Sequence, residues 1–219
     1  MVFFKVNTSS DAIKDSGTGA SFISKSGIYD VTIKTVSVVT NAHNARSLNF
    51  NIEYNGNEQV FYGLTLDNND GSENYKANIF NKLCIIAGVE AVNEPEIETH
   101  LLGKDKTPTD LAVLTEFSDL PVKMKVQNVY SKYNGEIREA REIRGFYRAD
   151  DGASASEIIN DVEPKQYTKD LETTKDILKD VTEEEVAAFI EARSASKDGA
   201  KPVTKPAAAT NKVNPFARK

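Results

Sequence analysis

Two Asn-Gly dipeptides, at positions 55–56 and 134–135, each separate two runs in which apolar and polar side chains alternate. Asn and Gly tolerate the positive φ values of a two-residue hairpin turn, and alternation places every second side chain on one face of a strand. The sequence therefore predicts two β-hairpins, and with them a mainly β fold.

A further strand is predicted before the first hairpin. The run "GIYDVTIKTVSVVT", residues 27–40, alternates as far as Ile33 and resumes out of phase at Val36. One extra residue in a β-bulge near Lys34 and Thr35 would produce this shift. We expect one long bulged strand, which with the first hairpin makes three consecutive antiparallel strands.

The periodicity changes in "ENYKANIFNKLCIIAGV", where Ile79, Leu83 and Ile86 follow helical spacing and Gly88 is placed to end the helix. Residues 90–119 then show no sustained period and contain Pro and Gly. We expect a helix followed by a long connection that holds at most a short helix.

The stretch "SKYNGEIREAREIRGFYR", residues 131–148, fits two structures. Local propensity favours a helix after Asn134-Gly135, whereas the preceding alternating run and the aromatic ending favour the second strand of a hairpin. We take the strand, which puts Arg141 on one face. The opposite face then presents Arg138, Ala140, Arg144, Phe146 and Arg148.

Three strands, a helix and two strands are the element order of the OB-fold, a small five-stranded barrel. The predicted fold class is thus mainly β, a five-stranded OB-fold barrel with a helix between strands 3 and 4. Its domain spans residues 27–149, after an N-terminal arm, residues 1–26, to which Val2–Val6 would add a short strand. An acidic linker with short helices, residues 150–195, and a disordered basic tail, residues 196–219, follow.

Charge is unevenly distributed along the chain, whose formal net charge is −6. Residues 150–199 hold 6 Lys and Arg against 14 Asp and Glu, and Thr182 and Glu185 there have the spacing of a capping box. Residues 120–149 hold 7 basic against 3 acidic side chains. A basic surface is therefore expected on an acidic protein.

Several function classes find no support in the sequence. There is no apolar run of about 20 residues, no export signal, no zinc-type Cys/His spacing and no phosphate-binding loop, and Cys84 is the single cysteine. We expect a cytoplasmic protein that is not an enzyme and uses no cofactor or metal. A metal-dependent enzyme would need Asp67, Asp70 and Glu73, which lie in a turn-like segment.

Four segments carry a family resemblance: "GIYDVTIK", "LNFNIEYNG", "IFNKLCIIAGV" and "VKMKVQNVYSKYNGEIREAREIRGFY". Over about residues 26–149 the chain resembles phage-encoded single-stranded-DNA-binding proteins of the OB-fold type. The resemblance implies non-catalytic, sequence-tolerant binding of single-stranded DNA during phage DNA replication or recombination, in the host cell cytoplasm. Many such proteins end in an acidic tail, whereas here the acidic part is internal and the last residues are basic around Phe216.

Single-stranded DNA requires a basic groove for phosphates and aromatic faces for bases. Phe61 is expected to point outward if its neighbours Val60 and Tyr62 point into the barrel, although it could instead pack beneath the long connection. The basic residues could equally pair with neighbouring glutamates on a solvated strand. The candidate DNA-binding residues are Arg46, Phe61, Lys123, Lys125, Tyr130, Lys132, Tyr133, Arg138, Arg144, Phe146 and Arg148.

A second function stays open from the sequence. The chain could be a protein-interaction or virion-associated module, in which the barrel is a scaffold and the acidic C-terminal helices bind the partner. On the DNA-binding hypothesis, the partners implied for residues 150–219 are replication or recombination proteins. The sequence leaves the oligomeric state undetermined.

Overall fold

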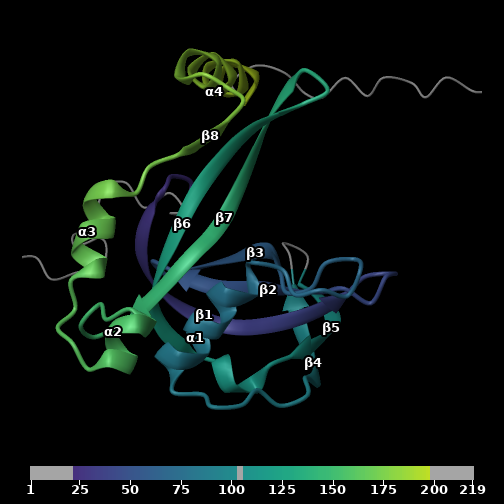
Figure 1. Ribbon diagram of the computed structural model, residues 1–219. Coiled ribbons are helices and arrows are strands. Elements are labelled where there is room, and N and C mark those ends of the chain that lie inside the picture. Colours follow the sequence, from purple (N-terminus) through teal and green to yellow (C-terminus); the bar gives the residue numbers. More distant parts are fainter. Residues whose placement is uncertain (1–21, 103–105, 198–219) are drawn as a thin grey trace, which may run out of the picture.

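The computed structural model describes residues 22–102 and 106–197, which form a mainly β structure (Figure 1). The strands are β1 (Gly27–Thr40), β2 (Arg46–Tyr54), β3 (Asn57–Thr65), β4 (Glu96–Leu102), β5 (Thr107–Val113), β6 (Leu120–Tyr133), β7 (Glu136–Arg148) and β8 (Ile177–Lys179). The helices are α1 (Ala77–Ala87), α2 (Ala155–Asn160), α3 (Gln166–Thr173) and α4 (Glu183–Lys197), with a 3-10 turn at Thr115–Phe117.

The strands form one open sheet. Strand β1 pairs with β2, β5 and β6, strand β6 pairs further with β7 and β8, and every pairing is antiparallel except that of β6 with β8. All five strands expected in residues 27–149 are present, and the stretch 136–148 is a strand and not a helix, but β4, β5 and β8 make the sheet eight-stranded, so the prediction of five strands is wrong. In the described part of the chain no backbone ladder joins β3 to β7, so the sheet does not close into a barrel.

The local turn and bulge predictions are confirmed. The register of β1 against β2 shifts between Ile33 and Thr35, which leaves the extra residue where the change of phase indicated. Both Asn-Gly turns have positive φ at both residues, 49° and 74° at 55–56 and 51° and 80° at 134–135. These are the conformations that a tight hairpin turn of matching twist needs.

Helix α1 is also confirmed, together with its end. Leu83 is fully buried, and Gly88 adopts a φ of 69° and donates its N–H to the carbonyl of Ile85. A left-handed residue at this position satisfies carbonyls that the helix would otherwise leave unpaired. The cap directs the chain out of the helix toward β4.

The expectation of a long connection over residues 90–119 is wrong. Strands β4 and β5 pair there from Glu96 opposite Val113 to Leu102 opposite Thr107. The apolar side chains of β4 that alternate, Ile97 and Leu101, are exposed, so the hairpin lacks the buried face that makes a strand recognisable. The short parallel strand β8 was not expected either.

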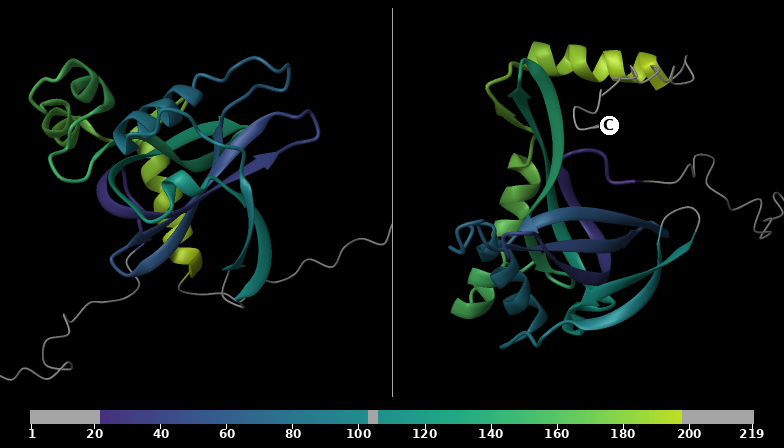
Figure 2. Two further views of the ribbon diagram at one scale, coloured as in Figure 1. Left: turned by 90° about the horizontal axis from the view of Figure 1, so that it is seen from below. Right: turned by 90° about the vertical axis from the view of Figure 1, so that its right-hand side faces the viewer.

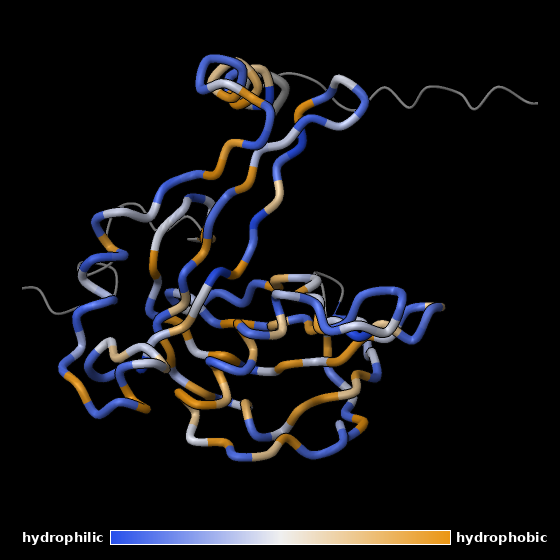
Figure 3. The backbone as a smooth tube through the Cα atoms, viewed as in Figure 1, coloured by the Kyte–Doolittle hydropathy of each residue, from blue (hydrophilic) through white to orange (hydrophobic). Residues whose placement is uncertain are grey.

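The hairpin of β6 and β7 has two parts. Its first part belongs to the body, where β6 pairs with β1 from Gly27 opposite Val126 to Ile33 opposite Leu120. Its outer part rises from the body as an arm, with β8 alongside and α4 across its end (Figures 1 and 2). Apolar residues concentrate in the body, whereas hydrophilic residues dominate the outer arm (Figure 3).

The C-terminal segments pack against this hairpin. Helix α4 begins with the expected capping box, in which Glu185 N–H donates to Thr182 Oγ1 at 3.2 Å and Thr182 N–H donates to Glu185 Oε2 at 3.0 Å. The helix runs to Lys197, so Ser196 and Lys197 are helical and not part of a disordered tail. The rest of that tail and the expected strand Val2–Val6 lie outside the described residues. No helix in the described ranges is long and apolar enough to cross a bilayer.

Candidate functional site

A groove follows the seam between β3 and β7. Three adjoining hollows, of about 130, 310 and 890 Å³, share Arg141 in their lining, and the two smaller ones also share Tyr62. The largest extends between residues 24–26 and α4. We call these hollows together the seam groove. The largest hollow lies on the β7 side of the seam and has no lining residue from β3.

A bulge in β3 turns Tyr62 toward this groove. Leu48 pairs with Leu64 and Phe50 with Phe61, so Tyr62 and Gly63 together oppose one residue of β2. Gly63 has a φ of 76°, a value that favours glycine in a bulge. The strict alternation of buried and exposed side chains in β3 ends at this bulge, and the buried residues Phe61 and Leu64 lie three positions apart.

The exposure of Phe61 predicted from the sequence is therefore wrong. Its side chain is 5% exposed and belongs to the hydrophobic core, whereas Tyr62 is 75% exposed. A base cannot stack on a ring buried in the core, but it can stack on Tyr62. An isolated glycine within a strand pattern is the sequence signal that indicates such a bulge.

Residues 22–26 cross the seam as a strap. Ile23 is 1% exposed; its N–H donates to Gln59 Oε1 at 2.9 Å, and its carbonyl accepts from Gln59 Nε2 at 3.2 Å. The same carbonyl accepts from Arg141 Nη1 at 2.7 Å, which joins β3 to β7 through the strap. Arg141 is thus held in the groove by a neutral carbonyl and forms no ion pair with the described residues.

Tyr130 is not available to a base, contrary to the sequence prediction. Helix α4 packs over the arm at this point, and the ring of Tyr130 is 2% exposed and lies 6.4 Å from that of Phe189 in an edge-to-face arrangement. Burial raises the pKa of the Tyr130 phenol. This aromatic ring holds α4 on the arm.

A second bulge changes the faces of β7. Lys125 opposes Gly145 and Val126 opposes Ile143, which leaves Arg144 as the extra residue. As a result Phe146 points into the core, 3% exposed and 5.7 Å from the Phe50 ring, and is not a stacking site. The predicted common face of Arg138, Arg144, Phe146 and Arg148 is therefore wrong.

Most of the predicted basic residues have carboxylate partners. A phosphate can replace the carboxylate in an exposed pair at small cost, whereas the Lys125–Asp170 and Arg144–Glu142 pairs are largely buried and hold their cations in place. The pairs are Arg46 with Asp67 (2.6 Å), Lys123 with Asp30 (2.5 Å), Lys125 with Asp170 (3.2 Å), Lys132 with Glu185 (2.6 Å), Arg144 with Glu142 (2.9 Å) and Arg148 with Asp151 (2.6 Å).

The arm tip brings two predicted residues together. Tyr133 is 54% exposed, and the Cζ atom of Arg138 lies 4.0 Å from its ring centroid. Arg138 forms no ion pair within the ranges that the structure describes. A guanidinium stacked on an exposed ring can contact both a phosphate and a base.

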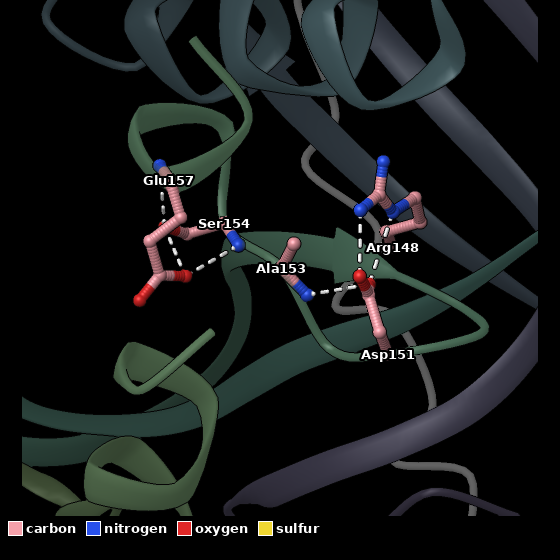
Figure 4. Close-up of polar contacts among 5 residues, drawn as sticks. All are labelled: Arg148, Asp151, Ala153, Ser154 and Glu157. Carbon is pink, nitrogen blue, oxygen red and sulfur yellow. Dashed lines mark hydrogen bonds and ion pairs between the residues drawn. The ribbon is translucent and has the colours of Figure 1, made fainter. Parts of the chain in front are cut away.

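Arg148 instead belongs to a structural cluster at the end of β7 (Figure 4). Its guanidinium binds both carboxylate oxygens of Asp151, and Asp151 Oδ1 accepts the N–H of Ala153 at 3.0 Å. Ser154 then caps α2 in a capping box with Glu157. These contacts fix the turn from the sheet into α2.

Glu157 extends the cluster toward α3. Burial acts to raise the pKa of Glu157, but the N–H groups of Lys165, Ser154 and Gln166, which its carboxylate accepts, lower it to about 2. Three N–H donors thus stabilise the charged form. One side chain thereby holds the starts of both α2 and α3.

Glu157→Gln should lower the free energy of unfolding by about 1 kcal/mol near neutral pH. Because the folded pKa lies below the ordinary value of 4.5, the contribution is complete above that value and is lost as the pH falls toward 2. Urea unfolding of both proteins between pH 2 and 7 measures this difference. Glu163→Gln, at an exposed side chain, is the control; equal stabilities of wild type and Glu157→Gln at pH 7 would contradict the assignment.

The acidic turn considered for metal binding is satisfied internally. Arg46 binds both oxygens of Asp67, and Asp70 accepts from the hydroxyl and the N–H of Ser72. The Arg46 side chain holds the pKa of Asp67 below its ordinary value. Within residues 22–102 and 106–197 no group of three or more His, Cys, Asp or Glu side chains is arranged to hold a metal ion.

Comparison with known proteins does not name a family. No protein-family model matches the chain, and no curated protein matches it either. The resemblance to phage single-stranded-DNA-binding proteins stays an expectation from the sequence segments quoted above.

Proposed function

We propose that this protein binds single-stranded DNA without catalysis. The DNA bases stack on Tyr62, and the DNA backbone lies along the seam groove. The observation that carries the proposal is the exposed Tyr62 ring, which lines the same two hollows as Arg141. Base stacking on an aromatic ring contributes about 1–3 kcal/mol and tolerates any sequence. A role in phage DNA replication or recombination follows from the family resemblance alone.

The arrangement of strands supports an OB-type binding face. Strands β1, β2, β3, β6 and β7, with α1 between the third and fourth of them, follow the OB order, and β1 pairs with both β2 and β6. The OB barrel is partly open, and its second and third strands carry the oligonucleotide. Tyr62 lies on the third strand, and the arm is the connection between the fourth and fifth.

The charge of the groove predicts a moderate dependence on salt. The lining cations only slightly outnumber the carboxylates, so few phosphates will be neutralised within the groove itself. Residues 200–219 add five basic and no acidic side chains to the chain. The charged lining residues are Lys25, Lys76, Arg141, Lys175 and Arg193, against Glu139, Glu142, Asp176 and Glu183.

Titration of a fluorescent oligothymidine with the full-length protein at several salt concentrations tests the proposal. Each neutralised phosphate should contribute about −0.7 to the slope of log K against log salt. The full chain is required because removal of the C-terminal segments would expose Tyr130. Absence of binding at low salt would refute the proposed function.

Tyr62→Ala should weaken oligothymidine binding by about 1–3 kcal/mol, since it removes a stacking surface. Tyr133→Ala tests the arm tip in the same assay. Ile159→Ala removes a side chain on α2 that is 66% exposed and outside the groove, and it should leave the affinity unchanged. Equal affinities of wild type and Tyr62→Ala would remove Tyr62 from the binding surface.

A second candidate function is supported by the surface of the C-terminal segments. Ile159 and Val162 are 66% and 56% exposed on and just after α2, within the acidic part of the chain. Exposed apolar side chains with acidic neighbours suit a protein partner. Joint replacement of both by Asp should abolish such a complex and leave oligothymidine binding intact.

A further inference from the structure

Strand β4 has a free edge. It lies at one end of the sheet path and pairs only with β5 among the described strands. Its seven residues, "EIETHLL", contain neither proline nor lysine, the residues that commonly protect an edge from pairing with another chain. Glu96 and Glu98 are the acidic side chains of this edge, and seven residues without proline can still pair with another strand.

A proline in β5 shows which backbone groups of β4 face this edge. Pro108 lies opposite Leu101 and has no N–H, so the two residues cannot form a hydrogen-bonded pair. In an antiparallel ladder the residues of a non-hydrogen-bonded pair direct their N–H and C=O groups away from each other. The backbone of Leu101, and by alternation that of Thr99 and Ile97, therefore points to the free edge.

The sequence of β4 is complementary to itself about Thr99. Antiparallel pairing of two copies around this residue places Ile97 opposite Leu101, and these side chains are 72% and 57% exposed. It also places Glu98 opposite His100, two residues whose side chains already meet at 2.8 Å within one chain. Positions related by the two-fold axis are both odd or both even, so the outward backbone groups of the two strands face each other.

We propose that β4 pairs with β4 of a second copy of this chain, antiparallel and centred on Thr99, to form a symmetric dimer with one continuous sheet. Ile97 and Leu101 are covered by cross-strand contacts, and Thr99 meets Thr99 of the second copy on the axis. Three alternate residues on each strand, Ile97, Thr99 and Leu101, exchange backbone hydrogen bonds. Because a single strand pair buries less than a standard interface of about 1,600 Å², the dimer should form reversibly with concentration.

The dimer is independent of the proposed DNA-binding function. None of the residues that line the three hollows of the seam groove belongs to β4 or β5. Variants of β4 should therefore alter assembly and leave the oligothymidine affinity of the monomer unchanged. Failure of one proposal would be distinguishable from failure of the other.

Sedimentation equilibrium of the full-length protein over a range of concentrations measures assembly. Wild type should shift from monomer to dimer, and Ile97→Lys and Thr99→Pro should remain monomeric. Thr99→Pro removes an N–H that faces the free edge, so the ladder between β4 and β5 is retained; circular dichroism checks that both variants fold. A monomeric wild type at every concentration, or a dimer that both variants preserve, would overturn the proposal.

Cysteine cross-linking tests the register. In a Cys84→Ala background, Thr99→Cys places two thiols on the axis at a Cα separation of about 5.5 Å, which suits a disulfide. Ile97→Cys alone should not cross-link, because its equivalents lie about four residues apart along the strands. A mixture of Ile97→Cys and Leu101→Cys proteins should cross-link as heterodimers. Equal cross-linking of Thr99→Cys and Ile97→Cys would refute the register.

Discussion

Phe61→Ala is expected to lower the free energy of unfolding by about 3–5 kcal/mol, whereas Tyr62→Ala should change it by less than about 0.5 kcal/mol. The two aromatic residues are adjacent in β3, but Phe61 is in the core and Tyr62 is 75% exposed. Truncation of Phe61 removes buried apolar surface and leaves a cavity. Truncation of Tyr62 removes a side chain that already contacts mostly water.

Urea unfolding followed by circular dichroism measures both values, and an unchanged m-value shows that the transition exposes the same surface. Each variant is the matched control for the other, because Phe61→Ala and Tyr62→Ala both remove an aromatic ring and lie at neighbouring positions of one strand. The reverse order of stabilities would place the bulge of β3 elsewhere than at Gly63. It would also return Phe61 to the list of candidate stacking residues.

Ile23→Ala should lower the free energy of unfolding by about 2–5 kcal/mol, although Ile23 belongs to no helix or strand. The side chain is 1% exposed and packs in the core. Its backbone, in addition, connects Gln59 of β3 with Arg141 of β7. A cavity at this position would loosen the link that the strap provides across the seam.

Thermal and urea unfolding of Ile23→Ala and Phe22→Ala provide the comparison. Phe22 is next to Ile23 but 53% exposed, so its truncation should cost much less. If the two variants were equally stable, the strap would not be a fixed part of the body. Gln59→Leu would then be expected to have no effect either.

The features that the sequence predicted correctly have local causes. The extra residue of β1 appears as a change of phase within a single strand, and the turns at 55–56 and 134–135 follow from the two residues that form them. Gly88 likewise ends α1 because of its own conformational freedom. In each case the deciding residues lie within a few positions of one another.

The features that the sequence did not predict depend on contacts between distant segments or on the bulges in β3 and β7. Tyr130 is buried by α4, which lies more than fifty residues further along the chain, and Ile23 is buried by strands that follow it. The bulges at Gly63 and Arg144 each change the phase of alternation between the residues before and after them, so strict alternation placed Phe61 and Phe146 on the wrong face. Of the predicted aromatic sites, only Tyr133 is exposed.

The pairing of β1 with β6 has a consequence for folding during synthesis. Gly27 pairs with Val126, so the ribosome must release about one hundred further residues before β1 acquires this partner. The hairpins β2–β3, β4–β5 and β6–β7 are local in sequence and can form early, whereas this long-range pairing must wait. Until then the nascent chain carries β1 with one side unpaired, which is the stage at which its apolar residues are most accessible to chaperones.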